Sequence, residues 1–280
     1  MIWLWAALLS TFAFGFGAFL LKVAAHRGYH SGPTLLGLYL PGVVLFAIPV
    51  FIESAWSIQS TVLLASLLIG AGSIVGNITF LKALMLGPGN LTIPLINTHL
   101  ILIVVMSITL FGEILTGQMI LGISLLLLAT SLITYNPTKT QSLVSKWWFV
   151  YVVLTILFVF IRNGGLKVTQ ELSFNNYLIL FYSYLGGVLF SVCQIWMHPS
   201  SIHACYPAIR LGLITGVFSF LGLYLYAYAL ETGPASIVAP IYTTYSLVAV
   251  MLCAIFYKEK LQMPQKIALG SLLIGLWLLA

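Results

Sequence analysis

Long apolar runs follow one another along the whole chain, and short clusters of Gly, Pro, Asn or charged residues separate them. A helix of about 20 apolar residues spans the hydrocarbon core of a bilayer, and the pattern lacks the alternation of a membrane β-barrel. We therefore predict an all-α integral membrane protein with ten transmembrane helices. The predicted helices lie at residues 2–25, 33–53, 61–86, 88–112, 115–135, 147–169, 175–197, 206–230, 234–256 and 263–280.

The composition agrees with a membrane protein. Of the 280 residues, 61% are hydrophobic and 6% are charged, whereas a soluble domain has about 25% charged residues. No basic segment precedes the run 2–25, so we expect it to remain as a helix and not to be removed as a signal peptide. Residues 136–146 have the character of a polar linker. We therefore predict a first five-helix repeat at 1–135, a linker loop at 136–146 and a second five-helix repeat at 147–280.

The two halves share a pattern of glycine and proline. A Gly-Pro pair followed by a second proline occurs at Gly87, Pro88 and Pro94, and again at Gly233, Pro234 and Pro240. A shift of 146 residues, the distance from Gly87 to Gly233, also aligns Gly76 with Gly222, Thr98 with Thr244 and Glu113 with Glu259. Because each half has five spans, the second copy must enter the membrane from the opposite side. Inverted repeats of this kind are common in secondary transporters, whose substrate site lies near the midplane between the halves.

The six residues of this pattern have a predicted role in gating. Proline suits the first turn of a helix, and a glycine before it allows a tight turn, so we predict helical hairpins with almost no loop. The second prolines, Pro94 and Pro240, lie inside the following helices and should bend them. The alternative is that each proline is an irregularity that membrane helices tolerate.

In this pattern the chain resembles a known transporter family. The ten spans, the five-plus-five duplication, the motif Leu84…Gly87-Pro88…Pro94…Gly112-Glu113 and its partner Ala229-Leu230…Gly233-Pro234…Pro240…Lys258-Glu259 are similar to the EamA type of the drug/metabolite transporter superfamily. The resemblance implies a transporter with a central cavity lined by spans 1, 3, 4, 6, 8 and 9, and with spans 5 and 10 packed outside. It does not indicate the substrate. The chain departs from the family pattern at Lys258, where the first copy has Gly112.

Polar side chains at membrane depth are costly to bury and are therefore candidates for function. The candidate substrate-binding residues are Asn77, Lys82, Asn97, Thr98, His99, Arg162, Asn163, Tyr224, Tyr228, Tyr242, Thr244 and Tyr245. If a midplane axis relates the repeats, the triplet at 97–99 faces the triplet at 243–245. His99 is suited either to carry a coupling proton or to form a structural hydrogen bond to a neighbouring helix.

Arg162 is notable because it lies more than one turn from the end of its span. Its planar guanidinium can hold a carboxylate or phosphate through two hydrogen bonds, and Gly164-Gly165 beside it could leave a gap for a ligand. Lys167, nearer the helix end, is expected to snorkel to the lipid headgroups. The tyrosines of spans 8 and 9 could add a wall of hydroxyls and rings, although core packing also explains them.

The acids lie at the ends of the predicted spans. They are Glu53, Glu113, Glu171, Glu231 and Glu259, and the chain contains no Asp. A neutral to positive cavity favours an anionic or zwitterionic metabolite, such as an amino acid or organic acid, over a cation. Glu113 and Glu259 are expected to be partners of helix ends or headgroups.

Other chemistry finds little support in the sequence. The cysteines at 193, 205 and 253 have no paired spacing, and no His or Cys cluster matches a metal-ligand spacing, so we expect no cofactor and no metal. No nucleotide-binding motif occurs, so a gradient should supply the energy. The expected partners are a small-molecule substrate and membrane lipids, without nucleic acid. Proton coupling and the choice between monomer and homodimer stay open.

The sequence thus predicts a secondary-active transporter in a bacterial-type inner membrane, with export of a small polar metabolite by alternating access. The alternatives are a multidrug efflux transporter of the same fold and a lipid-linked substrate carrier or membrane enzyme. Two arguments disagree on orientation. Lys and Arg gather on one side, which the positive-inside rule places in the cytoplasm with both termini outside, whereas the family resemblance favours termini inside.

Overall fold

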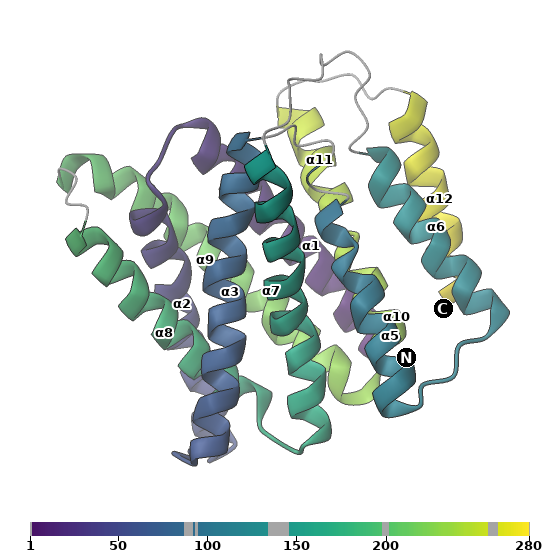
Figure 1. Ribbon diagram of the computed structural model, residues 1–280, viewed down its shortest axis with the longest axis horizontal. Helices are drawn as coiled ribbons and strands as arrows, with labels where there is room; N and C mark the ends of the chain where they lie inside the picture. The colour runs from purple at the N-terminus through teal and green to yellow at the C-terminus, as the bar shows by residue number, and fades with distance from the viewer. Residues whose placement is uncertain are drawn as a thin grey trace.

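The computed structural model describes residues 2–86, 92, 95–133, 146–197, 202–256 and 263–279. Within these residues every regular element is a helix, which confirms the predicted all-α class (Figure 1). The helices are α1 (Ile2–His26), α2 (Ser31–Ile52), α3 (Ser60–Leu86), α5 (His99–Phe111), α6 (Gly117–Ile133), α7 (Lys146–Glu171), α8 (Asn176–Met197), α9 (Ile202–Thr232), α10 (Ala235–Thr243), α11 (Tyr245–Phe256) and α12 (Met263–Leu279). The predicted gating residues Gly87, Pro88 and Pro94 lie outside the described residues.

Within the described ranges, six helices are long and apolar enough to cross a membrane. Their spans are Ile2–Ala24, Ser31–Ile52, Ser60–Ala83, Lys146–Glu171, Asn176–Met197 and Cys205–Thr232. Shorter apolar helices occupy Leu95–Phe111, Gly117–Ala129, Ala235–Ala249 and Lys266–Leu279. Large apolar side chains also face outward, for example Leu67 and Leu189, which are 68% and 64% exposed. Such a surface suits lipid contact, and the chain is a multi-pass membrane protein.

The helices pair closely through small residues, as is usual in membranes. Helix α3 packs along α7, α1 packs along α9, and α2 packs against both α8 and α9 (Figure 1). A Cβ on Gly212 of α9 would lie 2.5 Å from the carbonyl oxygen of Thr34 in α2. Only glycine therefore permits this approach of the two backbones. Helices α6 and α12 pack against each other beside this group.

The chain makes the same backbone turn at Thr98 and at Thr244. The N–H of Thr244 donates to the carbonyl of Ile241 at 3.1 Å, and the N–H of Leu247 donates to that of Thr244 at 2.9 Å. At Thr98 the equivalent bonds run to Leu95 at 3.1 Å and from Ile101 at 2.9 Å. These are bonds between residues three apart, which tighten a helix locally. The turn at Thr244 separates α10 from α11, and Pro240 lies one turn earlier, inside α10.

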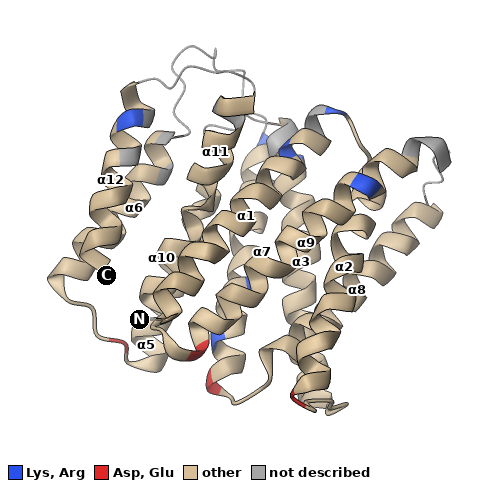
Figure 2. Ribbon diagram, turned by 180° about the vertical axis from the view of Figure 1, so that it is seen from behind, with Lys and Arg blue, Asp and Glu red and all other residues tan. Residues whose placement is uncertain are grey.

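Charges divide the molecule along the helix direction. Figure 2 shows most of the Lys and Arg positions at one end of the helices and the Glu positions at the other. The described glutamates are at the ends of α2, α7 and α9 and directly after α5. We name the two ends the basic end and the acidic end, and the chain begins toward the acidic end.

Candidate functional site

Arg162 of α7 lies at the centre of the helices, surrounded by tyrosines. Five tyrosines from five other helices lie near its guanidinium: Tyr39 of α2, Tyr184 of α8, Tyr226 of α9, Tyr242 of α10 and Tyr245 of α11. The first four of these tyrosines are almost completely buried, while Arg162 and Tyr245 keep partial exposure. We call Arg162, its neighbours His99 and Asn163, and these five tyrosines the central cluster.

Two nitrogens of Arg162 already have neutral acceptors. Nε donates to Oδ1 of Asn163 at 2.9 Å, and Nη2 donates to the hydroxyl of Tyr242 at 3.5 Å. Nε and Nη2 form one edge of the guanidinium, which can bind both oxygens of a carboxylate through two parallel hydrogen bonds. The amide and phenol oxygens therefore occupy the positions that an anionic group would take.

A chain of hydrogen bonds continues from Asn163 to α5. Nδ2 of Asn163 lies 3.2 Å from Nε2 of His99, and Nδ1 of His99 lies 2.8 Å from the carbonyl oxygen of Ile96. His99 is 1% exposed and Asn163 is fully buried. The structure thus brings together four of the predicted site residues, Arg162, Asn163, His99 and Tyr242, in a single connected network.

Aromatic rings form the wall of the central cluster. The ring of Tyr242 lies 4.6 Å from that of Tyr226 and 4.8 Å from that of Phe14, which it meets edge to face at 88°. Tyr245 extends the wall, with its ring 5.5 Å from Tyr242. Rings in these arrangements pack favourably beyond their buried area. The wall offers hydroxyls to a polar group and ring faces to an apolar one.

The predicted gap at Gly164-Gly165 is not present. A Cβ on Gly164 would meet Phe160 at 3.1 Å and Met106 of α5 at 3.3 Å, and a Cβ on Gly165 would meet Ile69 of α3 at 3.0 Å. Side chains of α3, α5 and α7 itself fill the space around these glycines. That expectation was therefore wrong.

The other asparagines of the predicted site also join helices. Asn77 donates to the hydroxyl of Tyr39 at 3.1 Å, and that hydroxyl lies 3.2 Å from Ser73. Asn97 donates to Ser246 at 3.4 Å, and this bond connects the two turns of the backbone, although Ser246 lies just outside the triplet at 243–245. The Oδ1 atom of Asn97 is buried and has no protein partner.

The remaining predicted residues lie outside the central cluster. The hydroxyls of Thr98 and Thr244 bond to the preceding turn of their own helices. Tyr224 stacks on Tyr177 at 5.0 Å, and Tyr228 is half-buried. Lys82 is exposed, with Nζ 5.3 Å from the ring centre of Tyr151. Among the gating residues, Pro240 lies within α10, and Gly233 and Pro234 precede it.

Glu113 forms a second polar network at the acidic end. Its two carboxylate oxygens accept hydrogen bonds from the backbone N–H groups of Ala235 and Ser236, each at 2.9 Å. Glu113 is thus a helix-end partner, as predicted, and caps the N-terminus of α10. Lys167 lies 3.7 Å from Glu113 and 2.7 Å from Glu171. The snorkelling expected for Lys167 is wrong, because this side chain is buried and paired within the protein.

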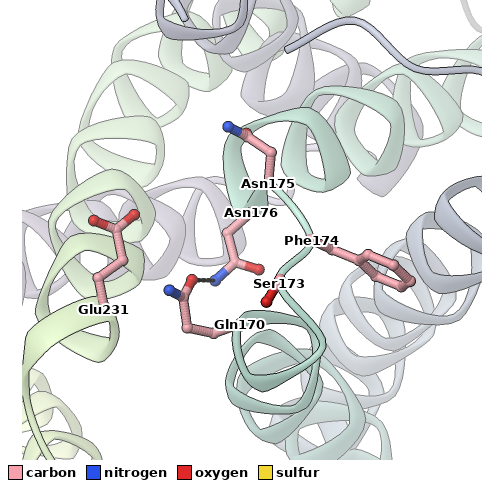
Figure 3. Close-up of a pocket in the computed structure, with 6 residues that line it drawn as sticks. All are labelled: Gln170, Ser173, Phe174, Asn175, Asn176 and Glu231. Carbon is pink, nitrogen blue, oxygen red and sulfur yellow. Dashed lines mark hydrogen bonds between the residues drawn. The ribbon is translucent and has the colours of Figure 1, made fainter.

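A polar cavity of about 330 Å³ also opens at the acidic end (Figure 3). Its lining residues are Gln170, Ser173, Phe174, Asn175, Asn176 and Glu231. Figure 3 shows the amide of Asn176 bonded to Gln170, and Asn176 also accepts a bond from Thr169 at 2.6 Å. Gln170 lies about two turns beyond Arg162 along α7. The cavity therefore lies toward the surface from the central cluster, and its amides already have partners.

Sequence reasoning missed Tyr39, Tyr184 and Tyr226. In span 8 it selected Tyr224 and Tyr228, which share one helical face, whereas Tyr226 between them faces Tyr242. The 146-residue shift aligns Tyr226 with Phe80, so the sequence shows only that an aromatic residue occupies this position in both halves. No group of three or more His, Cys, Asp or Glu that could hold a metal occurs among the residues that the structure describes.

Comparisons with known proteins match both the sequence and the fold. A family model described as "EamA-like transporter family" matches residues 146–280. The uncharacterized protein MJ1333.1 of Methanocaldococcus jannaschii is 30% identical over 94 residues, which are 34% of this chain and 69% of that protein. A solved crystal structure, described only as that of a protein, has a TM-score of 0.77 at 13% identity and covers 98% of this chain and 95% of that chain. This last likeness shows the fold alone.

Proposed function

The chain belongs to the EamA-like transporter family of the drug/metabolite transporter superfamily, and from this premise we propose that it is a secondary-active transporter of a small anionic or zwitterionic metabolite. Amino acids and organic acids have the required chemistry. We place the substrate in the central cluster, with its anionic group on Arg162. The membrane is proposed to be a bacterial-type inner membrane.

The environment of Arg162 is the observation that carries this proposal. Among the described residues no carboxylate forms an ion pair with Arg162, and its near neighbours are neutral oxygens of Asn163 and Tyr242. A charge at membrane depth without a counter-ion is unfavourable. A substrate anion would supply that counter-ion. A cationic drug would meet a like charge, so the cluster favours metabolite transport over multidrug efflux.

Alternating access is proposed to arise from two inverted repeats, at 1–135 and 147–280, joined by the loop 136–146. Two observations support this division. The pairing of α3 with α7 corresponds, under the 146-residue shift, to the pairing of α9 with α1. The turns at Thr98 and Thr244 also have matching backbone bonds. Rocking of one repeat against the other would expose Arg162 to the two sides in turn.

The basic end is proposed to face the cytoplasm. Lys and Arg gather there while the described glutamates lie at the opposite end (Figure 2), and the bias of basic residues sets orientation. A reporter fused after Ala280 should then lie outside the cytoplasm and be active there. Reporter activity in the cytoplasm would show that the orientation is the opposite one.

Transport in proteoliposomes tests the proposed function. We expect counterflow of labelled amino acids or organic acids by the wild type, a severalfold loss in Arg162→Lys and near abolition in Arg162→Gln, because lysine cannot reproduce the planar fork. Lys82→Gln is the matched control, since it removes an exposed charge outside the cluster, and it should transport normally. Transport of a lipophilic cation such as tetraphenylphosphonium, with no transport of any acid in the panel, would favour the multidrug alternative.

A further inference from the structure

We infer that Asn163 is a relay that links protonation of His99 to the position of Arg162, so that a proton and an anion bind to the central cluster together. The inference rests on the proposed function in one respect, because it takes Arg162 as the group that binds the transported anion. The relay itself follows from the direction of three hydrogen bonds.

The donors and acceptors fix the orientation of the Asn163 amide. Nε of Arg162 can only donate, so Asn163 must present Oδ1 to it, as the 2.9 Å bond shows. Nδ2 then faces Nε2 of His99 at 3.2 Å and must donate. Nε2 of His99 is therefore an acceptor without a proton. Nδ1, 2.8 Å from the carbonyl oxygen of Ile96, holds the proton of a neutral imidazole.

A proton added to His99 breaks this arrangement. Once Nε2 carries a proton from water, it becomes a donor that faces another donor, Nδ2 of Asn163. Rotating the amide by half a turn brings Oδ1 to His99 and restores that bond. The same rotation places Nδ2 against Nε of Arg162, so Arg162 loses its acceptor. Because an unpaired buried donor is unfavourable, Asn163 can satisfy Arg162 or protonated His99, but not both.

Arg162 is then free for a substrate. Its other bond, to Tyr242, is 3.5 Å long and lies beyond the usual range of strong hydrogen bonds. The edge formed by Nε and Nη2 can therefore take both oxygens of an anion. The anion would also screen the repulsion between the guanidinium and the new imidazolium. By linkage, an anion that binds Arg162 must favour protonation of His99 to the same extent.

Few other ionisable groups face His99. Helix α5 has no further titratable side chain and packs against α7 and α10. From α7 the facing charge is Arg162, and from α10 the single titratable side chain is Tyr242. Lys167 of α7 pairs with Glu113 beyond the far end of α5. The proton on His99 therefore communicates mainly with Arg162, through Asn163.

Joint binding sets the direction of coupled flux. A proton and an anion that bind together cross together, so a vesicle with an acidic exterior should accumulate the anion inside. In a cell whose proton gradient points inward, this coupling drives uptake, whereas the sequence predicts export. Export would require that substrate and proton exclude each other from the site.

The relay is tested by nitrogen-15 NMR of the imidazole groups in proteoliposomes, without any transport step. The signal of His99 is assigned by its loss in His99→Gln. Neutral His99 in the wild type should carry its proton on Nδ1. The titration midpoint of His99 is then measured in the wild type, Arg162→Gln, Asn163→Leu and the double variant, which form a double-mutant cycle.

Removal of the Arg162 charge should raise the midpoint in both backgrounds. When Asn163 is present, the rise should be larger by about one pH unit, a tenfold change in the protonation equilibrium. The reason is that the Asn163 amide, no longer held by Arg162, can then accept the hydrogen bond of protonated His99. Equal shifts in both backgrounds, or a neutral His99 with its proton on Nε2, would overturn the relay. If Asn163→Leu does not fold, Asn163→Ser replaces it, since a hydroxyl rotates freely and breaks the coupling while it keeps the site polar.

The two proposals fail in different ways. If the double-mutant cycle gives the expected unequal shifts but the vesicles transport no acid, the relay is kept and the proposed function is rejected. Normal anion transport with equal shifts in the cycle would reject the relay alone.

Discussion

The carboxylate of Glu113 accepts a hydrogen bond from the backbone N–H of Ser236 at 2.9 Å, although 123 residues separate the two in the chain. Glu113 belongs to the proposed first repeat and α10 to the second. The same carboxylate lies 3.7 Å from Lys167, which is also in the second repeat. These bonds join the two proposed halves at the acidic end, which the proposed alternating access would open and close.

Loss of the Glu113 charge should loosen this end. Glu113→Gln keeps an oxygen for one backbone N–H, loses the other acceptor and removes the partner of Lys167. We expect the protein to fold with a lower thermal midpoint, since a lost helix cap costs about 1 kcal/mol. In a Cys193→Ser background, Gln170→Cys should react faster with a water-soluble maleimide when Glu113→Gln is added. An unchanged reaction rate would mean that Glu113 stabilises α10 without closing the acidic end.

Gly72 should be required for the position of Arg162. A Cβ at Gly72 of α3 would lie 2.7 Å from the carbonyl oxygen of Phe158 and 2.9 Å from the amide nitrogen of Arg162. These are backbone atoms of α7, so Gly72→Ala must push the two helices apart, at a cost of about 1–3 kcal/mol. We expect a lower thermal midpoint and slower transport. Gly186→Ala is the control, because a Cβ there meets no atom within 4 Å, and it should match the wild type in both measurements.

Pro240 should matter for transport more than for stability. Pro240→Ala supplies an N–H that can bond to the carbonyl four residues earlier and straightens the helix before the turn at Thr244. We expect an equal or higher thermal midpoint and a severalfold loss of transport. The same result is expected for Pro94→Ala, because Pro94 is the equivalent of Pro240 in the proposed first repeat. The control is Pro207→Ala near the start of α9. Normal transport by both Pro240→Ala and Pro94→Ala would reduce these prolines to tolerated irregularities.

Periodicity and composition were sufficient to predict the fold class. Apolar runs of membrane length predict helices because no water is present to satisfy a free backbone, and the described helices match most of the predicted spans. The turn within span 9 was predicted only as a bend at Pro240. The structure places the interruption at Thr244, one turn after Pro240.

The candidate site was predictable only in part. Arg162, Asn163 and His99 were found because polar groups are rare at membrane depth. Tyr39 and Tyr184 were missed, since they come from α2 and α8, and only the packing of these helices places them near Arg162. Lys167 was misassigned for a similar reason. A sequence shows a lysine near a helix end, but not that Glu113 lies beside it.

The hydroxyl of Tyr242 should compete with the substrate for Arg162. Tyr242→Phe removes the acceptor at 3.5 Å from Nη2 while the ring keeps its packing against Phe14 and Tyr226. A hydrogen bond of this length is at the weak end of the range, about 0.5–1 kcal/mol, so we expect KM for the anion to fall about two- to fivefold with little change in the thermal midpoint.

Tyr184→Phe is the matched control for this prediction. The hydroxyl of Tyr184 belongs to the same central cluster but bonds to Ser219 at 2.7 Å and not to Arg162. Its removal should lower the thermal midpoint, because Ser219 loses a buried partner, and should leave KM unchanged. A higher KM in Tyr242→Phe would contradict the competition, because it would make the hydroxyl a ligand of the substrate. A lower KM in both variants would point to a general loosening of the cluster instead.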